Sequence, residues 1–202
     1  MLISEIFRSI QGEGKNQGRP CTFIRLAGCN LRCSWCDTPK SWEGGLDCSC
    51  TEVLESVRSY EGSYACITGG EPLLQGDDVR MLGYALQEMG YMIDIETNGT
   101  IDFRPFQPFA SICMDVKCPS SGEKSDVALL SYIRDDDSVK FVVKDIPDCR
   151  YATDIIRKHD IRGEIFISPV YGSPPAEIAS FILEHDLPVR LQLQLHRILG
   201  MR

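Results

Sequence analysis

Three cysteines close together in the N-terminal part of the chain are the residues best suited to chemistry. Cys29, Cys33 and Cys36 follow one another with three and then two intervening residues. Thiolates bind iron–sulfur clusters, and short spacing on one loop lets several thiolates converge at a small cost in backbone entropy. Three ligands on a four-iron cube leave one iron open to bind another molecule through nitrogen and oxygen. The spacing therefore predicts a [4Fe–4S] cluster with one iron available.

A structural zinc ion is the main alternative for this triplet. Cys21, Cys48 or Cys50 could supply a fourth thiolate, because spacers of two to four residues are also normal in zinc sites. The protein would then be a zinc-stabilised scaffold rather than an enzyme. Trp35, between the last two cysteines of the triplet, favours the cluster because an aromatic ring shields it from water and tunes its potential. The same ring could equally belong to the core.

The remaining cysteines do not indicate a disulfide framework. Met1–Arg8 has the alternation of a strand rather than the pattern of a signal peptide, so we expect a cytoplasmic protein with reduced thiols. Cys66, Cys113, Cys118 and Cys149 lie in or beside predicted strands and helices, where buried, unreactive thiols are the ordinary case.

Composition excludes several classes of partner. The net charge is −8 and the Lys and Arg residues are dispersed, which argues against direct nucleic-acid binding. No segment approaches the roughly 20 apolar residues needed to cross a bilayer, so no membrane partner is expected. A chain of 202 residues suits one sizeable core, and we expect a single domain over residues 1–202.

The elements that must position the cysteines alternate between strand and helix. Apolar or β-branched runs predict strands at Leu2–Phe7, Thr22–Leu26, Tyr64–Thr68, Tyr91–Glu96, Ser111–Val116, Val139–Val143, Glu164–Ile167 and Val189–Leu193. Helical patterns occupy Thr51–Tyr60, Asp77–Met89, Asp148–His159 and Pro175–Glu184, with Asp77 expected to cap the second helix and Gly90 to end it.

This alternation predicts an α/β fold with a largely parallel sheet and right-handed crossovers, whose ligands gather at the carboxyl ends of the strands. A complete eight-unit barrel needs about 250 residues. We therefore expect a reduced, open TIM-like barrel of parallel strands with outer helices. Asn30–Cys50 is a long stretch without periodicity, and loops of that length are usually functional.

A second segment strengthens the cluster interpretation. Thr68-Gly69-Gly70-Glu71-Pro72 follows an apolar strand, and glycines let the backbone approach a ligand closely. Together with the cysteine triplet, this segment resembles the radical S-adenosylmethionine superfamily, in which a Gly-Gly-Glu-Pro segment contacts the methionine amino group. The resemblance implies that Gly70 and Glu71 bind S-adenosylmethionine beside the cluster and Trp35.

A narrower resemblance, to the 7-carboxy-7-deazaguanine synthase family, covers nearly the whole chain. It rests on Ile10-Gln11-Gly12-Glu13-Gly14, Phe23–Leu31, Cys36-Asp37-Thr38 and Glu96-Thr97-Asn98-Gly99-Thr100. It implies a lyase that contracts 6-carboxy-5,6,7,8-tetrahydropterin to 7-carboxy-7-deazaguanine with loss of ammonia, using S-adenosylmethionine, the cluster and Mg²⁺. It also implies a flavodoxin- or ferredoxin-type electron donor, a homodimer, and a product that feeds the queuosine or archaeosine of tRNA.

Activating enzymes for glycyl-radical proteins share the same cysteine spacing, so an activase with a protein partner is a competing hypothesis. The N-terminal segments separate the two. We would not expect Gln-Gly-Glu-Gly to precede a Phe-Ile-Arg-Leu-Ala-Gly-Cys strand in an activase, and this chain has both.

Arg25 stands four residues before the first cysteine of the triplet, between apolar neighbours. A guanidinium can bind a carboxylate through two parallel hydrogen bonds. The alternative is a surface ion pair. Because a buried arginine without an anionic partner is costly, we favour a contact with the substrate carboxylate.

The family resemblance implies further substrate contacts at Ile10, Gln11, Gly12, Glu13 and Thr68. Amide, backbone and carboxylate groups of the Gln-Gly-Glu segment could bind the edge of a pterin, although the segment could also be an ordinary turn.

The remaining implied roles concern the cofactors. Thr38 resembles the family's Mg²⁺ ligand, which suits a hard cation that takes oxygen donors, while Asp37 is expected at the S-adenosylmethionine site and to act indirectly on the metal. Lys117 and Ser168 are expected near S-adenosylmethionine, although the segment at Lys117 lacks the Ser-Pro-Lys form that would contact the ribose. His196 is expected to be a hydrogen-bonded strand or terminal histidine, although the family's chain end also approaches the substrate.

Overall fold

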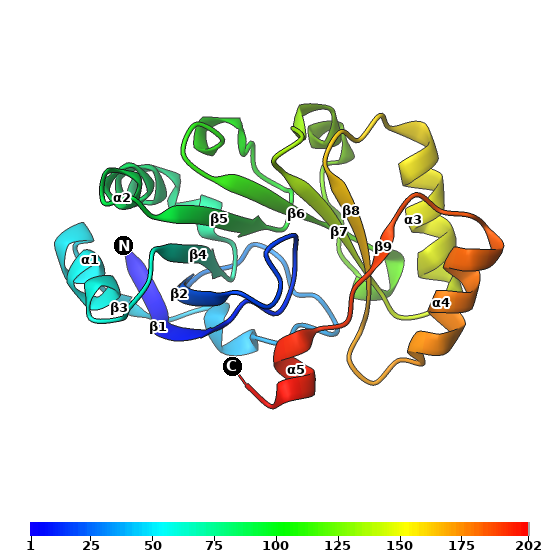
Figure 1. The fold of residues 1–202 in the computed structure, drawn as a ribbon, viewed down its shortest axis with the longest axis horizontal. Helices are drawn as coiled ribbons and strands as arrows, with labels where there is room; N and C mark the ends of the chain where they lie inside the picture. The colour runs from blue at the N-terminus through cyan, green and yellow to red at the C-terminus, as the bar shows by residue number, and fades with distance from the viewer. Residues whose placement is uncertain (202) are drawn as a thin grey trace.

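The computed structural model describes residues 1–201, and its centre is one curved sheet with the strand order β3-β1-β2-β4-β5-β6-β7-β8-β9 (Figure 1). The strands are β1 (Leu2–Ile10), β2 (Pro20–Leu26), β3 (Leu46–Asp47), β4 (Tyr64–Gly69), β5 (Met92–Thr97), β6 (Ser111–Lys117), β7 (Ser138–Val143), β8 (Glu164–Pro169) and β9 (Arg190–Leu191). Neighbours from β2 to β9 run parallel, whereas β1 is antiparallel to both β2 and β3. The carboxyl ends of the parallel strands therefore meet at one edge.

The helices cover the outside of this curve. They are α1 (Cys50–Arg58), α2 (Gly76–Glu88), α3 (Ile146–Lys158), α4 (Pro175–Glu184) and the short α5 (Leu195–Leu199). Figure 1 shows α1 to α4 along the outer side of the strands, while α5 lies on the open side of the arc. The predicted α/β fold, an open partial barrel with outer helices, is confirmed.

Local sequence explains where the helices begin and end. At α1, the Ser49 hydroxyl accepts from the Glu52 amide at 3.3 Å, and the Glu52 carboxylate accepts from the Ser49 amide at 2.8 Å. This reciprocal cap stabilises a helix start by about 0.5–2 kcal/mol. Helix α2 begins at Gly76, so the prediction that Asp77 caps it is wrong. Asp77 lies in the first turn, where its charge still favours the helix dipole, and Gly90, at φ 80°, follows the helix end as expected.

The core lies between the sheet and the outer helices. Val79, Leu82 and Leu86 form one face of α2 and are fully buried in the same cluster as Ile67 of β4 and Ile95 of β5. Burying one side chain of this size contributes about 1.5–3 kcal/mol. The outer face of the sheet is thus committed to packing, which leaves the inner face for polar groups.

The structure adds elements that the sequence patterns did not predict. All eight predicted strands are present, but β1 extends to Ile10, and the two-residue β3 pairs with its start. Strand β9 is confined to Arg190–Leu191 because the chain then turns toward α5, a helix that was not predicted. No helix within residues 1–201 combines the length and apolar character that a membrane crossing requires.

Candidate active site

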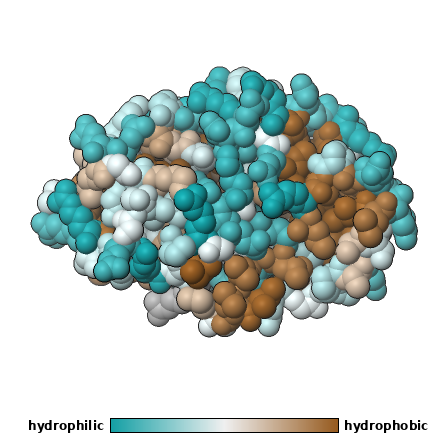
Figure 2. Space-filling model, viewed as in Figure 1, coloured by the Kyte–Doolittle hydropathy of each residue, from teal (hydrophilic) through white to brown (hydrophobic). Residues whose placement is uncertain are grey.

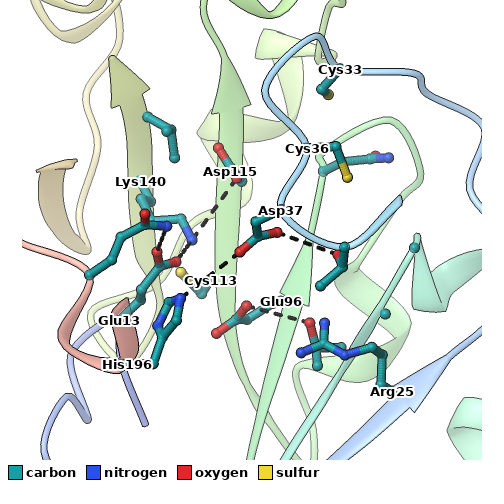
Figure 3. Close-up of a pocket in the computed structure, with 18 of the residues that line it drawn as sticks. Glu13, Arg25, Cys33, Cys36, Asp37, Glu96, Cys113, Asp115, Lys140 and His196 are labelled. Carbon is teal, nitrogen blue, oxygen red and sulfur yellow. Dashed lines mark hydrogen bonds and ion pairs between the residues drawn. The ribbon is translucent and has the colours of Figure 1, made fainter. Parts of the chain in front are cut away.

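A cavity of about 440 Å³ lies inside the curve of the sheet, at the carboxyl ends of β2 and β4 to β7 (Figure 3). Strand alternation supplies its polar lining. Ile67 and Ile95 are buried in the core, and the next residues along their strands, Thr68 and Glu96, line the cavity. Because successive strand side chains point to opposite faces, each strand contributes to both the core and the cavity.

The loop after β2 brings the cysteine triplet to one wall. Cys29, Cys33 and Cys36 all line the cavity, are half-buried and carry free thiols. Burial raises the pKa of Cys29 and of Cys33. Positively charged metal at this wall would favour their deprotonated form, since a thiolate is the metal ligand.

The Gly-Gly-Glu-Pro segment packs directly on this loop. The Glu71 amide donates to the Gly28 carbonyl at 2.8 Å, and the Gly70 amide donates to the Leu26 carbonyl at 3.1 Å. A Cβ atom on Gly70 would lie 2.2 Å from the Gly28 carbonyl oxygen and 2.8 Å from Cys29 Cβ. Only glycine fits at position 70 without moving the cysteine loop.

On the opposite wall, a half-buried carboxylate links two of the predicted substrate residues. Glu96 of β5 accepts from Gln11 Nε2 and from the Thr68 hydroxyl, each at 3.4 Å. Gln11 also donates to the Tyr64 hydroxyl at 3.4 Å. Burial raises the pKa of Glu96, against the opposing effect of Lys140.

Arg25 lines the cavity and is also ion-paired. Its Nε lies 3.0 Å from Glu5 Oε1, and Glu5 in turn pairs with Lys40 at 3.0 Å. The guanidinium lies over the Phe7 ring, 5.7 Å from its centroid. The ion pair expected as the alternative is therefore present, but it uses one of five guanidinium donors, so the side chain can still bind an anion in the cavity.

A network of buried charges completes this wall. Lys140 of β7 contacts Glu13 and lies 4.0 Å from Asp115 Oδ2, while Lys117 lies 2.9 Å from the same oxygen. The carboxamide of Gln194 donates to Glu13 Oε1 at 2.6 Å. Burial alone would raise the pKa of Glu13, but Lys140 and the hydrogen bonds lower it to about 2.

Comparison with known proteins decides which family this arrangement belongs to. Residues 23–111 match the model of the Radical SAM superfamily. The 7-carboxy-7-deazaguanine synthase of Methanospirillum hungatei is 54% identical over 201 residues, covering 100% of this chain and 86% of that protein. The chain belongs to the 7-carboxy-7-deazaguanine synthase family.

Two further relatives agree with this assignment. The 7-carboxy-7-deazaguanine synthase of Thermoplasma acidophilum is 39% identical and covers 98% of this chain and 97% of its own. The crystal structure of QueE from Escherichia coli superposes with a TM-score of 0.79 at 25% identity, covering 96% of this chain and 94% of that one. As a synthase of the radical S-adenosylmethionine superfamily, the protein uses a [4Fe–4S] cluster, S-adenosylmethionine and Mg²⁺.

The cysteine wall of the synthase fits a cluster better than the zinc alternative. The three thiols that would hold the cluster line one cavity. Cys21 is buried beside Phe23 in a separate apolar cluster, while Cys48 and Cys50 pack against the main core. None of these three lines the cavity, so the candidates for a fourth zinc ligand lie away from the triplet.

Trp35 and Lys117 form a contact next to the cysteines. The Trp35 indole donates to the Ser120 hydroxyl at 3.0 Å, and the Lys117 ammonium lies 5.4 Å from the centre of its ring. Both side chains line the cavity, as expected for residues near S-adenosylmethionine. A cation over an aromatic face favours a fixed ring position.

Two predicted cofactor residues lie behind the cavity wall rather than in it. Glu71 is fully buried and accepts from the Leu73 amide at 3.0 Å, the Thr97 hydroxyl at 2.9 Å and the Asn98 amide at 2.6 Å. Its pKa is raised by burial to about 7. Ser168 is also fully buried, and its hydroxyl has no hydrogen-bond partner among the described residues. Their contacts with S-adenosylmethionine stay predictions.

The candidate Mg²⁺ position lies between the cysteine loop and α5. The Thr38 hydroxyl is 3.4 Å from Asp37 Oδ1, and both side chains line the cavity. Asp37 Oδ2 lies 3.9 Å from His196 Nε2 and 3.7 Å from Arg197 Nη2. Hydroxyl and carboxylate oxygens suit Mg²⁺, so Thr38 with Asp37 beside it fits the ion.

His196 lies on α5 near the chain end and faces the cavity, which agrees with the expectation of a terminal histidine and not with a place in a strand. Burial lowers its pKa. Cys113 is buried as predicted, but it also lines the cavity.

The structure thus gathers nearly all predicted site residues into one cavity, including the Ile10–Glu13 segment. Sequence reasoning missed Glu96, Asp115, Lys140, Gln194 and Arg197. For Lys140 a signal existed, because a lysine within the otherwise apolar Val139–Val143 run is costly to bury without a carboxylate partner.

Proposed function

We propose that this chain converts 6-carboxy-5,6,7,8-tetrahydropterin to 7-carboxy-7-deazaguanine with loss of ammonia, as a carbon–nitrogen lyase. The observation that carries this proposal is that one cavity joins the cysteine wall, Cys29, Cys33 and Cys36, to Arg25 and Glu13 on the facing wall. A cluster on the first wall would face a carboxylated heterocycle on the second.

Cluster and S-adenosylmethionine, when bound, supply the radical chemistry that removes a hydrogen atom from the substrate. The protein's part is to orient the pterin. Arg25 binds the substrate carboxylate through charge-assisted hydrogen bonds, and Gln11, Gly12 and Glu13 bind the pyrimidine edge. Thr38 holds Mg²⁺ near the same carboxylate, where the cation offsets its charge.

Trp35, Trp42 and Leu31 line the cavity with apolar surface. They exclude water from the reacting groups, which strengthens every electrostatic contact inside and protects a reactive intermediate from side reactions. Lys117 sits at the S-adenosylmethionine side of the cavity, over Trp35, and Ser168 is buried outside the cavity lining.

The proposal extends to partners and context. The enzyme is a single domain and acts in the cytoplasm. It takes its electron from a flavodoxin- or ferredoxin-type donor. Its product supplies the 7-deazapurine of queuosine or archaeosine. It works as a homodimer. Support for self-association comes from Ile198, Leu199 and Met201, which are exposed apolar residues at the chain end, where Figure 2 shows an apolar patch over α5.

The test is turnover of the purified, anaerobically reconstituted protein with 6-carboxy-5,6,7,8-tetrahydropterin, S-adenosylmethionine, Mg²⁺ and a chemical reductant. We expect 7-carboxy-7-deazaguanine and ammonia in equal amounts, identified by mass and by absorbance, without any protein partner. Cleavage of S-adenosylmethionine with the pterin unchanged would reject this substrate and favour the activase hypothesis. Iron without sulfide, or zinc, in the reconstituted protein would reject the cluster.

A further inference from the structure

Glu13 is held at both of its carboxylate oxygens by residues from distant parts of the chain (Figure 3). The Lys140 ammonium contacts Oε2, and the Gln194 carboxamide donates to Oε1 at 2.6 Å. Glu13 and Lys140 are only 8% and 5% exposed. Two fixed donors on opposite oxygens leave the carboxylate one orientation.

The backbone on either side of Glu13 is fixed by the same C-terminal segment. Leu195 donates its amide to the Gly12 carbonyl at 3.1 Å. The Gln192 side chain accepts from the Gly14 amide at 2.7 Å and donates to the Gly14 carbonyl at 2.9 Å. Residues 192–195 therefore act as a brace for the 12–14 loop.

We propose that Lys140 and Gln194 are positioning residues of the substrate site, which hold Glu13 as an oriented acceptor for the N–H donors of the pyrimidine edge. This inference rests on the proposed function. A 2-amino-4-oxopyrimidine presents a ring N–H beside an exocyclic amine, and a carboxylate has about four lone-pair sites, of which Lys140 and Gln194 occupy two. Glu13 lines the cavity, so the remaining sites are left for a ligand there.

The charges around the pair explain why Lys140 is needed. Glu13 faces Lys140 of β7, His196 of α5 and Glu96 of β5. Lys140 also faces Glu96 and Asp115 of β6. Two further β6 groups interact electrostatically with Lys140. Cys113 raises the pKa of Lys140, and Lys140 opposes the rise in the pKa of Lys117. Without Lys140, the carboxylates of Glu13, Glu96 and Asp115 lose the positive charge that they share. The pKa of Glu13 then rises, because only the Gln194 hydrogen bond and His196 still oppose the effect of burial.

The test measures binding of 6-carboxy-5,6,7,8-tetrahydropterin to the reconstituted holoenzyme by anaerobic calorimetry between about pH 6 and pH 8.5. The affinity of each variant is divided by that of wild type at the same pH. This ratio cancels the effect of ligand ionisation. For Lys140→Met we expect affinity to fall about 10- to 100-fold at the acidic end and to recover as pH rises. Lys140→Arg keeps the charge and should show a ratio that does not change with pH.

The matched control is Lys144→Met, the same change at an exposed lysine just beyond the end of β7. It should leave affinity unchanged. A Glu13→Gln substitution should weaken binding in wild type but cost little more in the Lys140→Met background, because the two residues act as one unit. Gln194→Leu should weaken binding about 3- to 10-fold without pH dependence, while cleavage of S-adenosylmethionine in the absence of substrate continues.

Three results would overturn the inference. The affinity of Lys140→Met could equal that of wild type, or the ratio of the two affinities could be the same at every pH. The losses of binding free energy in Lys140→Met and Glu13→Gln could also be fully additive. If Lys140→Met does not assemble a cluster, the Gln194→Leu variant provides the test. Unchanged substrate affinity in that variant would contradict the positioning role. Failure of the proposed function looks different, since wild type itself would then not bind the pterin.

Discussion

The two walls of the cavity achieve their geometry by different means. On the cofactor wall, three thiols come from one short loop, and the backbone of Gly70 sets its distance from the neighbouring segment, where an added Cβ would lie 2.2 Å from a carbonyl oxygen. On the substrate wall, side chains converge from the loop after β1 and from β2, β4, β5, β6, β7 and α5, and buried charges such as Glu13 and Lys140 balance one another.

The difference bears on how each wall tolerates change. The shape of the cofactor wall is fixed by main-chain contacts. Adding an atom to this wall, or removing one of its thiols, should therefore impair its function. The substrate wall depends on charge balance, so it should accept substitutions that keep charge and reject those that remove it. A substitution in one wall can therefore be compared with the undisturbed function of the other.

The largest effect is expected at the thiols. Cys29→Ala, Cys33→Ala and Cys36→Ala should each abolish the visible absorbance of the cluster and the cleavage of S-adenosylmethionine, because no other side chain of the loop replaces a lost thiolate. Cys48→Ala is the matched control, since this cysteine packs against the core outside the cavity. Iron loss in the control, or retained cleavage in any triplet variant, would contradict the assignment.

Gly70→Ala should follow, with cleavage of S-adenosylmethionine reduced about tenfold or more, since the added methyl group must displace the Gly28 carbonyl or Cys29. Substrate affinity should change far less, because the opposite wall is untouched. Gly76→Ala provides the comparison: there the nearest atom would lie 3.4 Å from the new Cβ, and activity should be retained. Equal effects of the two substitutions would remove the argument for close approach.

Arg25→Ala should weaken substrate binding by about 1.5–3 kcal/mol, roughly 10- to 150-fold, because a charge-assisted contact is lost at a desolvated site. Cleavage of S-adenosylmethionine uncoupled from turnover should persist. Lys40→Ala removes the other partner of Glu5 on the protein surface and serves as the control. Calorimetry with both variants separates substrate binding by Arg25 from its ion pair with Glu5. Unchanged substrate affinity in Arg25→Ala would mean that Arg25 serves only the ion pair.

The smallest effect is expected at the boundary between the walls. Thr38→Ala should raise the Mg²⁺ concentration needed for half-maximal turnover by less than about tenfold, since one oxygen ligand among several is lost. The cluster should assemble normally. Ca²⁺ should support turnover poorly, because it prefers oxygen distances of about 2.3–2.6 Å rather than about 2.0–2.1 Å. Thr51→Ala, at an exposed position of α1, is the control. Full activity with chelator present would exclude the metal role.

The same contrast separates what the sequence could predict from what it could not. The cysteine triplet and the Thr68–Pro72 segment are short and continuous, so the order of their residues is enough to predict their chemistry. Strands and helices were also predictable, because periods of two and of 3.6 residues are local properties. The start of α2 was placed wrongly at Asp77 because an acidic residue suits both a cap and a first turn.

Sequence by itself therefore determined the cofactor wall, the α/β alternation and the segments that resemble the synthase family. Tertiary structure alone decided the partners of Glu13, because Lys140 lies 127 residues away and Gln194 lies 181 residues away. It also decided that Glu71 is buried behind the wall and that α5 brings His196 to the cavity. Such contacts depend on which strand ends meet in the curved sheet and on where the chain end returns, and no local pattern of residues encodes either.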